Sequence, residues 1–203
     1  MKIASAALVA VSLFAAPAAG QVAFSGTRTN IDAPGAPAAR CGSRTTTSVV
    51  NAPPTSTSSG LSNFGAFTPT LSHCIQLPPS LVGPTPFDLG EFSFVFENGD
   101  TLFGTYAGEL SPLSPGLFGV SQTHLVTGGT GLFAAVTGSF ASSGTLDFRS
   151  GRPTVNQSFS GLLNIPAIPE PASWMMMLIG FGLTGGAMRV TRAKAARRMK
   201  VVV

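Results

Sequence analysis

His73 and His124 are the only histidines of this 203-residue chain and the side chains best suited to proton transfer near neutral pH. Serine and aspartate residues that could complete a catalytic triad are plentiful. However, the sequence contains no Gly-x-Ser-x-Gly turn that would expose a serine nucleophile. His124 falls on a predicted strand, where a histidine is more often a core or surface residue than a catalyst. We therefore predict no catalytic residues and no enzymatic activity.

The other motifs with ligand chemistry are incomplete. Residues 128–131, Gly-Gly-Thr-Gly, could surround a phosphate, but the Lys and Ser/Thr of a P-loop do not follow them. Residues 97–100, Glu-Asn-Gly-Asp, lack the regular acidic spacing of a calcium loop. Acids that could pair for glycoside hydrolysis are interpreted as turn and solubility residues, because Glu91 and Glu97 lie on the predicted solvent face. We expect no metal and no cofactor.

The first twenty residues have the pattern of a secretory signal peptide. Lys2 is followed by an apolar run over residues 3–16 and then by small residues at 17–20. This order predicts a signal peptide at residues 1–20, with cleavage after Gly20 or Ala18. The alternative, an N-terminal membrane anchor, is less favoured because the run is short for a bilayer.

Export would place the two cysteines, Cys41 and Cys74, in an oxidising compartment where thiols pair. One disulfide is the simplest interpretation, because no second Cys-x-x-Cys motif or histidine cluster completes a metal site. By the chain-entropy argument such a loop would stabilise the fold by about 3 to 4 kcal/mol.

The net charge of +4 comes from the end of the chain. Half of the twelve lysines and arginines lie in the last fifteen positions. Between residues 21 and 168 there are five arginines against seven acids, so the body is mildly acidic. We therefore predict that it does not bind nucleic acid.

Residues 165–200 combine a proline-rich segment, an apolar span and a basic tail. Residues 172–188 would be about 26 Å long as a helix, which predicts one C-terminal transmembrane helix. The cations after the span predict a membrane stop that stays in the cytoplasm and leaves the body outside. The stop residues are Arg189, Arg192, Lys194, Arg197 and Arg198.

A short motif lies where this span begins. Its residues are Pro169, Glu170, Pro171 and Trp174, followed by Gly-Phe-Gly-Leu at 180–183. The combination resembles the PEP-CTERM sorting domain in its Trp-containing proteobacterial variant, except that Met175 stands where Ala often follows the Trp. The resemblance implies cleavage near Pro-Glu-Pro by an exosortase, a membrane cysteine protease-transpeptidase. It also implies an inner-membrane precursor that faces the periplasm and is later sorted to the cell surface or the extracellular space.

The exported domain, residues 21–164, has strand periodicity. Residues 91–97 alternate and place three phenylalanines on one face, and Asn98-Gly99 predicts a type I′ hairpin turn. No stretch has sustained helical periodicity. We predict an all-β fold, an antiparallel barrel or sandwich, with Phe92, Phe94 and Phe96 facing inward. Further strands are predicted at residues 45–50, 64–74, 101–110, 121–126, 140–149 and 155–163.

A weaker resemblance concerns the glycine-rich turns of this domain. Asn-Gly-Asp at 98–100 and Gly-Gly-Thr-Gly-Leu-Phe-Ala at 128–134, with Gly138 after it, resemble segments of dirigent and allene-oxide-cyclase-like barrels. This implies an antiparallel barrel closed around a Phe-lined interior.

These patterns favour a non-enzymatic cell-surface or extracellular-matrix protein that is processed by exosortase, anchored transiently in the inner membrane and associated with exopolysaccharide. The alternative is a lipocalin-like barrel that binds a small apolar ligand, and an extracellular enzyme is the third option. The filling of the interior separates them. Packed phenylalanines favour the structural role, whereas an open cavity with polar groups favours the carrier or the enzyme.

Overall fold

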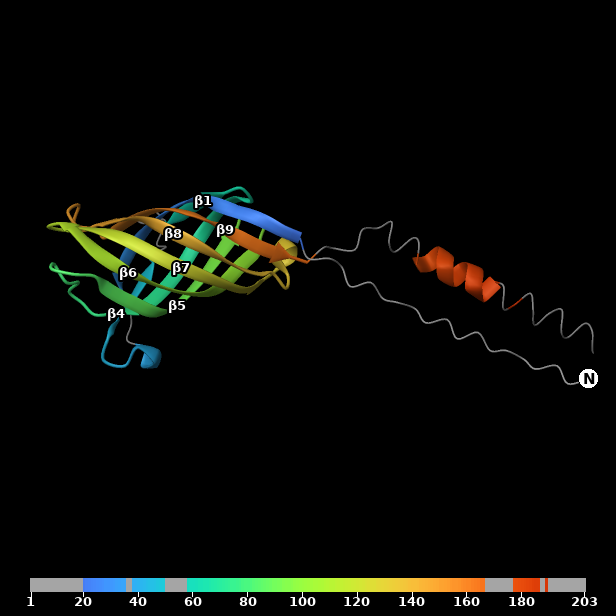
Figure 1. Ribbon diagram of the computed structural model, residues 1–203, viewed down its shortest axis with the longest axis horizontal. Helices are drawn as coiled ribbons and strands as arrows, with labels where there is room; N and C mark the ends of the chain where they lie inside the picture. The colour runs from blue at the N-terminus through green and yellow to red at the C-terminus, as the bar shows by residue number, and fades with distance from the viewer. Residues whose placement is uncertain (1–19, 36–37, 50–57, 167–176, 187–188, 190–203) are drawn as a thin grey trace, which may run out of the picture. The chain divides into compact units, whose positions relative to one another are not determined.

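The computed structural model describes residues 20–35, 38–49, 58–166, 177–186 and 189. The described residues between Ala19 and Pro166 form one compact unit, built almost entirely of strands (Figure 1). Two 3₁₀ turns, η1 (Ala39–Cys41) and η2 (Gly131–Phe133), accompany them. The strands are β1 (Gly20–Pro34), β2 (Thr45–Val49), β3 (Ser59–Ser62), β4 (Gly65–Ile75), β5 (Thr85–Phe96), β6 (Thr101–Ser114), β7 (Leu117–Gly129), β8 (Thr137–Asp147) and β9 (Thr154–Ile165).

The nine strands belong to one antiparallel sheet that closes on itself. Each strand from β4 to β9 pairs with the next along the chain, and β9 pairs with β1 from Gly20↔Ile165 to Ile31↔Thr154. The short strands β2 and β3 both pair with β1 and with β4, so together they fill the one position between those strands. The predicted all-β fold is confirmed, and it is a barrel rather than a sandwich.

Side chains alternate between the inside and the outside of the barrel. Phe92, Phe94 and Phe96 are buried as predicted, while Glu91 and Glu97 are exposed. Interior glycines leave room for the phenylalanine rings. A Cβ at Gly26, for example, would lie 2.7 Å from the Phe159 ring, closer than side-chain atoms approach.

The turn between β5 and β6 differs from the prediction. Four residues, 97–100, separate the strands, and only Gly99 among them has a positive φ, of 86°. A type I′ turn needs positive φ at both central residues, so that prediction is wrong. The reason is local: the Asn98 side chain accepts a hydrogen bond from the Asp100 amide, which stabilises a longer turn.

The strands also extend further than the sequence predicted. β5 begins six residues before residue 91, because a bulge around Leu89, with φ of 50°, re-registers it against β6. β1 lies in a stretch for which no strand was predicted. The strands predicted at 45–50 and 64–74 correspond to β2 and β4.

The C-terminal unit is described only through residues 177–186, which are helical, and residue 189. The helix lies within the span predicted at 172–188, whose other residues fall outside the described set. Among the residues described, no helix is both long enough and apolar enough to cross a membrane. The predicted signal peptide, apart from Gly20, also falls outside the described residues.

Candidate functional site

The barrel interior has three levels. The end nearest Gly20 and Ile165 is filled by phenylalanine rings, and we call it the packed end. Phe94 is fully buried there and stacks on Phe67 with ring centroids 4.5 Å apart. The other buried members include Phe24, Phe92, Phe96, Leu102, Val126, Phe133, Val136, Phe140, Phe159 and Leu163.

A polar layer crosses the middle of the barrel, and its centre is Arg28 of β1. Only 2% of this arginine is exposed. Its Nε and Nη2 donate to Gln157 Oε1 at 2.9 and 2.6 Å, and Nη2 also donates to Gln122 Oε1. The guanidinium lies 5.7 Å from the Phe94 ring centroid, so the layer rests directly on the packed end. The members of the polar layer are Arg28, His73, Tyr106, Gln122, His124 and Gln157.

His124 is fully buried between two aromatic rings. The strand register places it opposite Tyr106 on β6 and Phe140 on β8, and its ring stacks on both at 5.1 and 4.3 Å. Burial and the nearby Arg28 hold the pKa of His124 well below its usual value. The side chain is therefore neutral, with Nε2 facing the Arg28 guanidinium at 3.5 Å.

His73 and Tyr106 form the second contact within the layer. The His73 Nδ1 and Tyr106 Oη atoms are 2.8 Å apart. Burial lowers the pKa of His73 to about 4, with a smaller contribution from Arg40, and burial raises the pKa of Tyr106. Both groups are neutral at pH 7, so one hydrogen bond joins them, and the tautomer of the imidazole sets which group donates.

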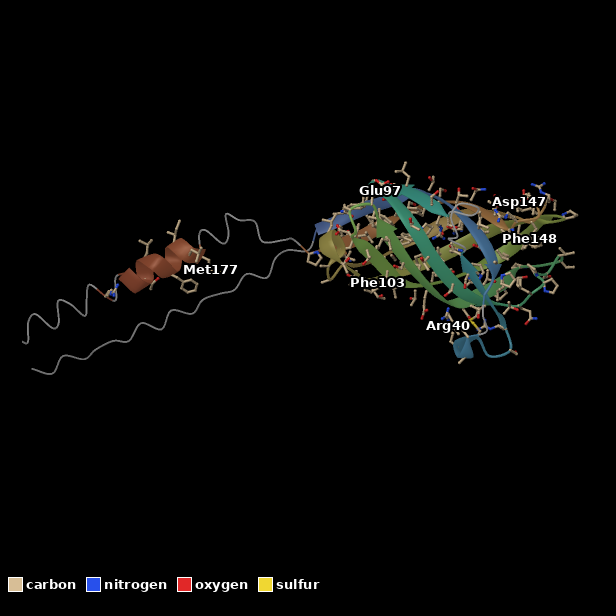
Figure 2. The ribbon with its side chains drawn as sticks, turned by 180° about the vertical axis from the view of Figure 1, so that it is seen from behind. Arg40, Glu97, Phe103, Asp147, Phe148 and Met177 are labelled. Atoms are coloured by element: carbon tan, nitrogen blue, oxygen red, sulfur yellow. A yellow bond between two sulfur atoms is a disulfide. The ribbon has the colours of Figure 1, made fainter. Side chains whose placement is uncertain are left out.

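Beyond the polar layer, at the end away from Gly20 and Ile165, a cavity of about 160 Å³ remains open. We call this the cavity end. Asp32, Thr47, His73 and Gln122 supply its polar lining. Its apolar wall contains one side chain from each of six strands: Ile75, Phe87, Leu110, Val120, Leu146 and Val155. Figure 2 shows Phe148, another lining residue, at this end of the barrel, with Glu97 at the other.

Asp32 is the acidic group of the cavity. Part of the residue reaches solvent, but its Oδ1 is buried and has no hydrogen-bond partner in the described part of the chain. Burial raises the pKa of Asp32 to about 7, although the positive charge of Arg28 acts in the opposite direction. The carboxyl group is thus poised between its neutral and ionised forms near physiological pH.

This arrangement is suited to binding rather than to the chemistries that the sequence raised. His73 and His124 point into the interior, and both are neutral because their pKa values are lowered. Among the described residues, their ring nitrogens contact Tyr106 and Arg28 and not a serine–aspartate pair. In the described ranges, no three His, Cys, Asp or Glu side chains are grouped so that they could hold a metal ion. An apolar cavity with a few fixed polar groups is typical of a small-molecule site.

The predicted disulfide is present. Cys41 and Cys74 are bonded, with Cα atoms 5.2 Å apart, and the bond fastens η1 to β4. Two exposed ion pairs fasten the same segment to β5: Arg40 to Glu91 at 3.1 Å and Arg44 to Asp88 at 2.7 Å. These acids therefore have surface roles, as the sequence indicated.

The predicted sorting residues lie almost wholly outside the described set. This applies to Pro169, Glu170, Pro171 and Trp174 and to the stop residues Arg192, Lys194, Arg197 and Arg198. Arg189 is described and is helical. The roles assigned to all of them stay predictions.

Sequence reasoning missed most of the polar layer and Asp32. Arg28 and Gln157 occupy inward positions that apolar residues usually fill, two or four residues from Phe24 and Phe159. The available signal was this even spacing: a polar residue two or four positions from a buried phenylalanine on the same strand lies on the same, inward face. For His124 the core interpretation was correct.

Comparison with protein families identifies the C-terminal region. The family model of the PEP-CTERM protein-sorting motif matches residues 167–193, which confirms the resemblance seen in the sequence. No curated protein and no solved structure matches the chain, so the resemblance to dirigent-like barrels is not confirmed.

Proposed function

With a PEP-CTERM protein-sorting motif at residues 167–193 as the premise, we propose that the chain is exported, held by a C-terminal anchor in the inner membrane, cut by an exosortase near Pro169-Glu170-Pro171 and sorted to the cell surface. The motif match is the observation that carries this proposal, and it supports exosortase-dependent export. Two further features agree with export. Residues 1–20 have a signal-peptide pattern. The Cys41–Cys74 disulfide fits an oxidising compartment.

The experiment compares Glu170→Ala with Glu97→Ala, a matched change at an exposed turn of the barrel. Glu170 lies outside the apolar span, so its loss should leave insertion intact but leave the precursor uncut in the inner membrane. The readout is cell fractionation together with the mass of the protein, in strains with and without the exosortase. Glu97→Ala should be processed normally. Identical C-termini and identical location in both strains would falsify the proposed sorting.

For the barrel itself we propose a non-enzymatic role at the cell surface or in an exopolysaccharide matrix. The closed sheet supports this, since it leaves the long strands paired on both sides and gives a body resistant to edge association. The packed end and the disulfide add rigidity. The test is retention of the exported protein by the producing strain's exopolysaccharide, against a variant lacking residues 21–164. Equal release of both into the medium argues against the matrix role.

A second candidate function is a carrier or sensor of a small apolar molecule. The cavity end favours it, because the interior is not filled throughout by phenylalanine. The interior-filling criterion thus divides the molecule: the packed end fits a structural role, and the cavity end fits a ligand-binding role.

A further inference from the structure

We propose that the cavity end is a binding site for a small neutral alcohol: an apolar group about the size of one six-membered ring that carries one hydroxyl. This inference rests on the second candidate function above and specifies its ligand. It is carried by three features of the cavity, namely its volume, its wall and the unpaired acceptors beside it.

The volume matches a single ring. The cavity measures about 160 Å³. A cavity of roughly 150 Å³ lined by leucine, isoleucine and phenylalanine is known to stay dry and to bind benzene. A fatty acyl chain or a fused-ring system would need more space than this. The size therefore selects molecules of about one ring.

The wall matches an apolar ligand on all sides. One aliphatic or aromatic side chain from each strand between β4 and β9 faces the space, so a ligand would be surrounded rather than covered on one face. The residues there, such as Val120 and Leu146, are smaller than the phenylalanines at the packed end. The cavity thus arises from the small size of the inward side chains. The alternation of inward and outward residues along β7 and β8 is the same at both ends of the barrel.

The two unpaired acceptor oxygens on β1 call for a hydrogen-bond donor; the other unpaired buried atoms of the described residues, His124 Nδ1 and Gln157 Nε2, belong to the polar layer. Asp32 Oδ1 is buried beside the cavity without a partner among the described residues, and Asn30 Oδ1, on the same face of β1 and only 3% exposed as a residue, is unpaired as well. Two of the other polar lining residues already have partners: His73 is bonded to Tyr106, and Gln122 Oε1 accepts from Arg28 and Ser142. A ligand that donates one hydrogen bond would relieve the cost of an unpaired acceptor.

The charges of the interior favour a neutral donor. A protonated amine would bring a second positive charge toward Arg28, which is fixed in the layer below. A carboxylate would face Asp32 and further oxygen acceptors, while the Nε and Nη2 donors of Arg28 are already bonded to the two glutamines. A hydroxyl group has neither disadvantage, because it donates without carrying charge.

The test uses the full-chain protein and two probes that differ in one group, benzyl alcohol and toluene, with titration calorimetry and the thermal midpoint as readouts. Both should bind, because both fill the cavity. Benzyl alcohol should bind about tenfold more tightly, the factor expected for one additional buried hydrogen bond.

Two pairs of variants locate the site. Val120→Phe fills the cavity and should weaken the binding of both probes at least tenfold. Leu125→Phe places the same side chain at an exposed position of the same strand and should leave the affinity of both probes unchanged. Asp32→Leu should abolish the preference for benzyl alcohol and leave toluene binding unchanged, while Asp32→Asn, which keeps an acceptor oxygen, should retain the preference. Leu146→Phe replaces Val120→Phe if circular dichroism shows that the latter is unfolded.

The outcomes separate the inference from the function on which it rests. If neither probe binds the wild type, the carrier function and the inference both fail. If both probes bind equally, the ligand needs no hydroxyl. If Asp32→Leu keeps the preference, Asp32 is not the acceptor of the hydroxyl. In either case the inference fails while the carrier function stands. Binding that survives both cavity-filling variants places the probes elsewhere and also overturns the inference.

Discussion

The packed end and the cavity end are built on the same strands with the same alternation, yet one is filled and the other is hollow. On β5, Phe94 and Phe96 fill the barrel near the turn, and Phe87 borders the cavity at the other end. On β7, Val126 lies against the packed end and Val120 against the cavity. The difference teaches that closing the sheet fixes which residues face inward, while the size of those residues decides whether a space remains.

The polar layer lies between the two ends and is attached to both. Arg28 packs over Phe94 on one side, and Gln122 lines the cavity on the other. The layer is held by hydrogen bonds to a single buried charge, with both histidines neutral, so it forms a defined floor for the cavity. The following predictions test whether the two ends differ in energy as they do in packing.

Phe94→Ala should have the largest effect, a loss of about 3 to 5 kcal/mol in the free energy of unfolding. The Phe94 ring contacts four other phenylalanine rings, so its removal leaves a cavity with no means to collapse. Phe87→Ala deletes the same atoms at the cavity end, where the ring already borders empty space and has fewer contacts to lose. Urea denaturation should show the smaller loss for Phe87→Ala; equal losses would mean that the two ends are packed alike.

Replacing both cysteines, Cys41→Ala with Cys74→Ala, should cost about 3 kcal/mol, because the unfolded chain regains the freedom of the closed loop. The disulfide lies at the level of the cavity, next to His73 and Ile75. Hydrogen exchange should therefore accelerate in β2 and β4 near the cavity before it does so at the packed end. An unchanged urea midpoint would show that the ion pairs of Arg40 and Arg44 hold η1 without the disulfide.

The packed end could be predicted from the sequence because its signal is local and apolar. Phe92, Phe94 and Phe96 alternate within five residues, so their shared face is visible without any partner strand. The disulfide followed in the same way from the number of cysteines and the compartment. The turn type was wrong, because the Asn98 side chain favoured a longer connection.

The cavity end could not be predicted, for two physical reasons. β1 contributes Arg28, Asn30 and Asp32 to the interior, and hydrophobic periodicity cannot detect inward residues that are polar. Moreover, β1 is held by β9, about 130 positions away in the chain, so its pairing leaves no local trace. A cavity is also a difference between the space enclosed and the volume of side chains, which no single segment encodes.

Arg28→Met tests the polar layer and should cost about 3 kcal/mol, because the buried Gln157 Oε1 loses its donor and Gln122 Oε1 keeps only Ser142. Replacing Gln122 and Gln157 by Met in the same chain should restore most of the loss, since the two acceptors that Arg28 served are then removed as well. Guanidinium denaturation of the single and triple variants measures both. If the triple variant is less stable than the single variant, the polar layer stabilises the fold by more than the hydrogen bonds between its members.

Asp32→Asn should have the smallest effect and one that depends on pH. The pKa of Asp32 is raised to about 7 in the folded protein, and an unfolded aspartate has a pKa of about 3.9. The stabilisation that Asp32 contributes to the wild type is fully present below about pH 4. It is lost as the pH rises through 7, because the buried carboxyl group must then release its proton. The asparagine variant carries no such charge. Above pH 8 it should be more stable than the wild type by about 2 kcal/mol, half of the full linkage value because part of Asp32 reaches solvent.

The measurement is urea denaturation of both proteins between pH 4 and pH 8.5, with the difference plotted so that contributions of His73 and His124 cancel. Asp147→Asn is the control with the opposite sign: the half-buried Asp147 is paired with Arg149, whose hydrogen bonds lower the pKa of Asp147 to about 2. Removing that carboxylate should never raise stability above pH 4. A gain for Asp32→Asn that grows from pH 4 to pH 8 would establish the cavity end as the place where the barrel retains an unsatisfied polar group, as the proposed alcohol site requires. A difference independent of pH would mean that the carboxyl group is well solvated, and the contrast between the two ends would then be one of packing alone.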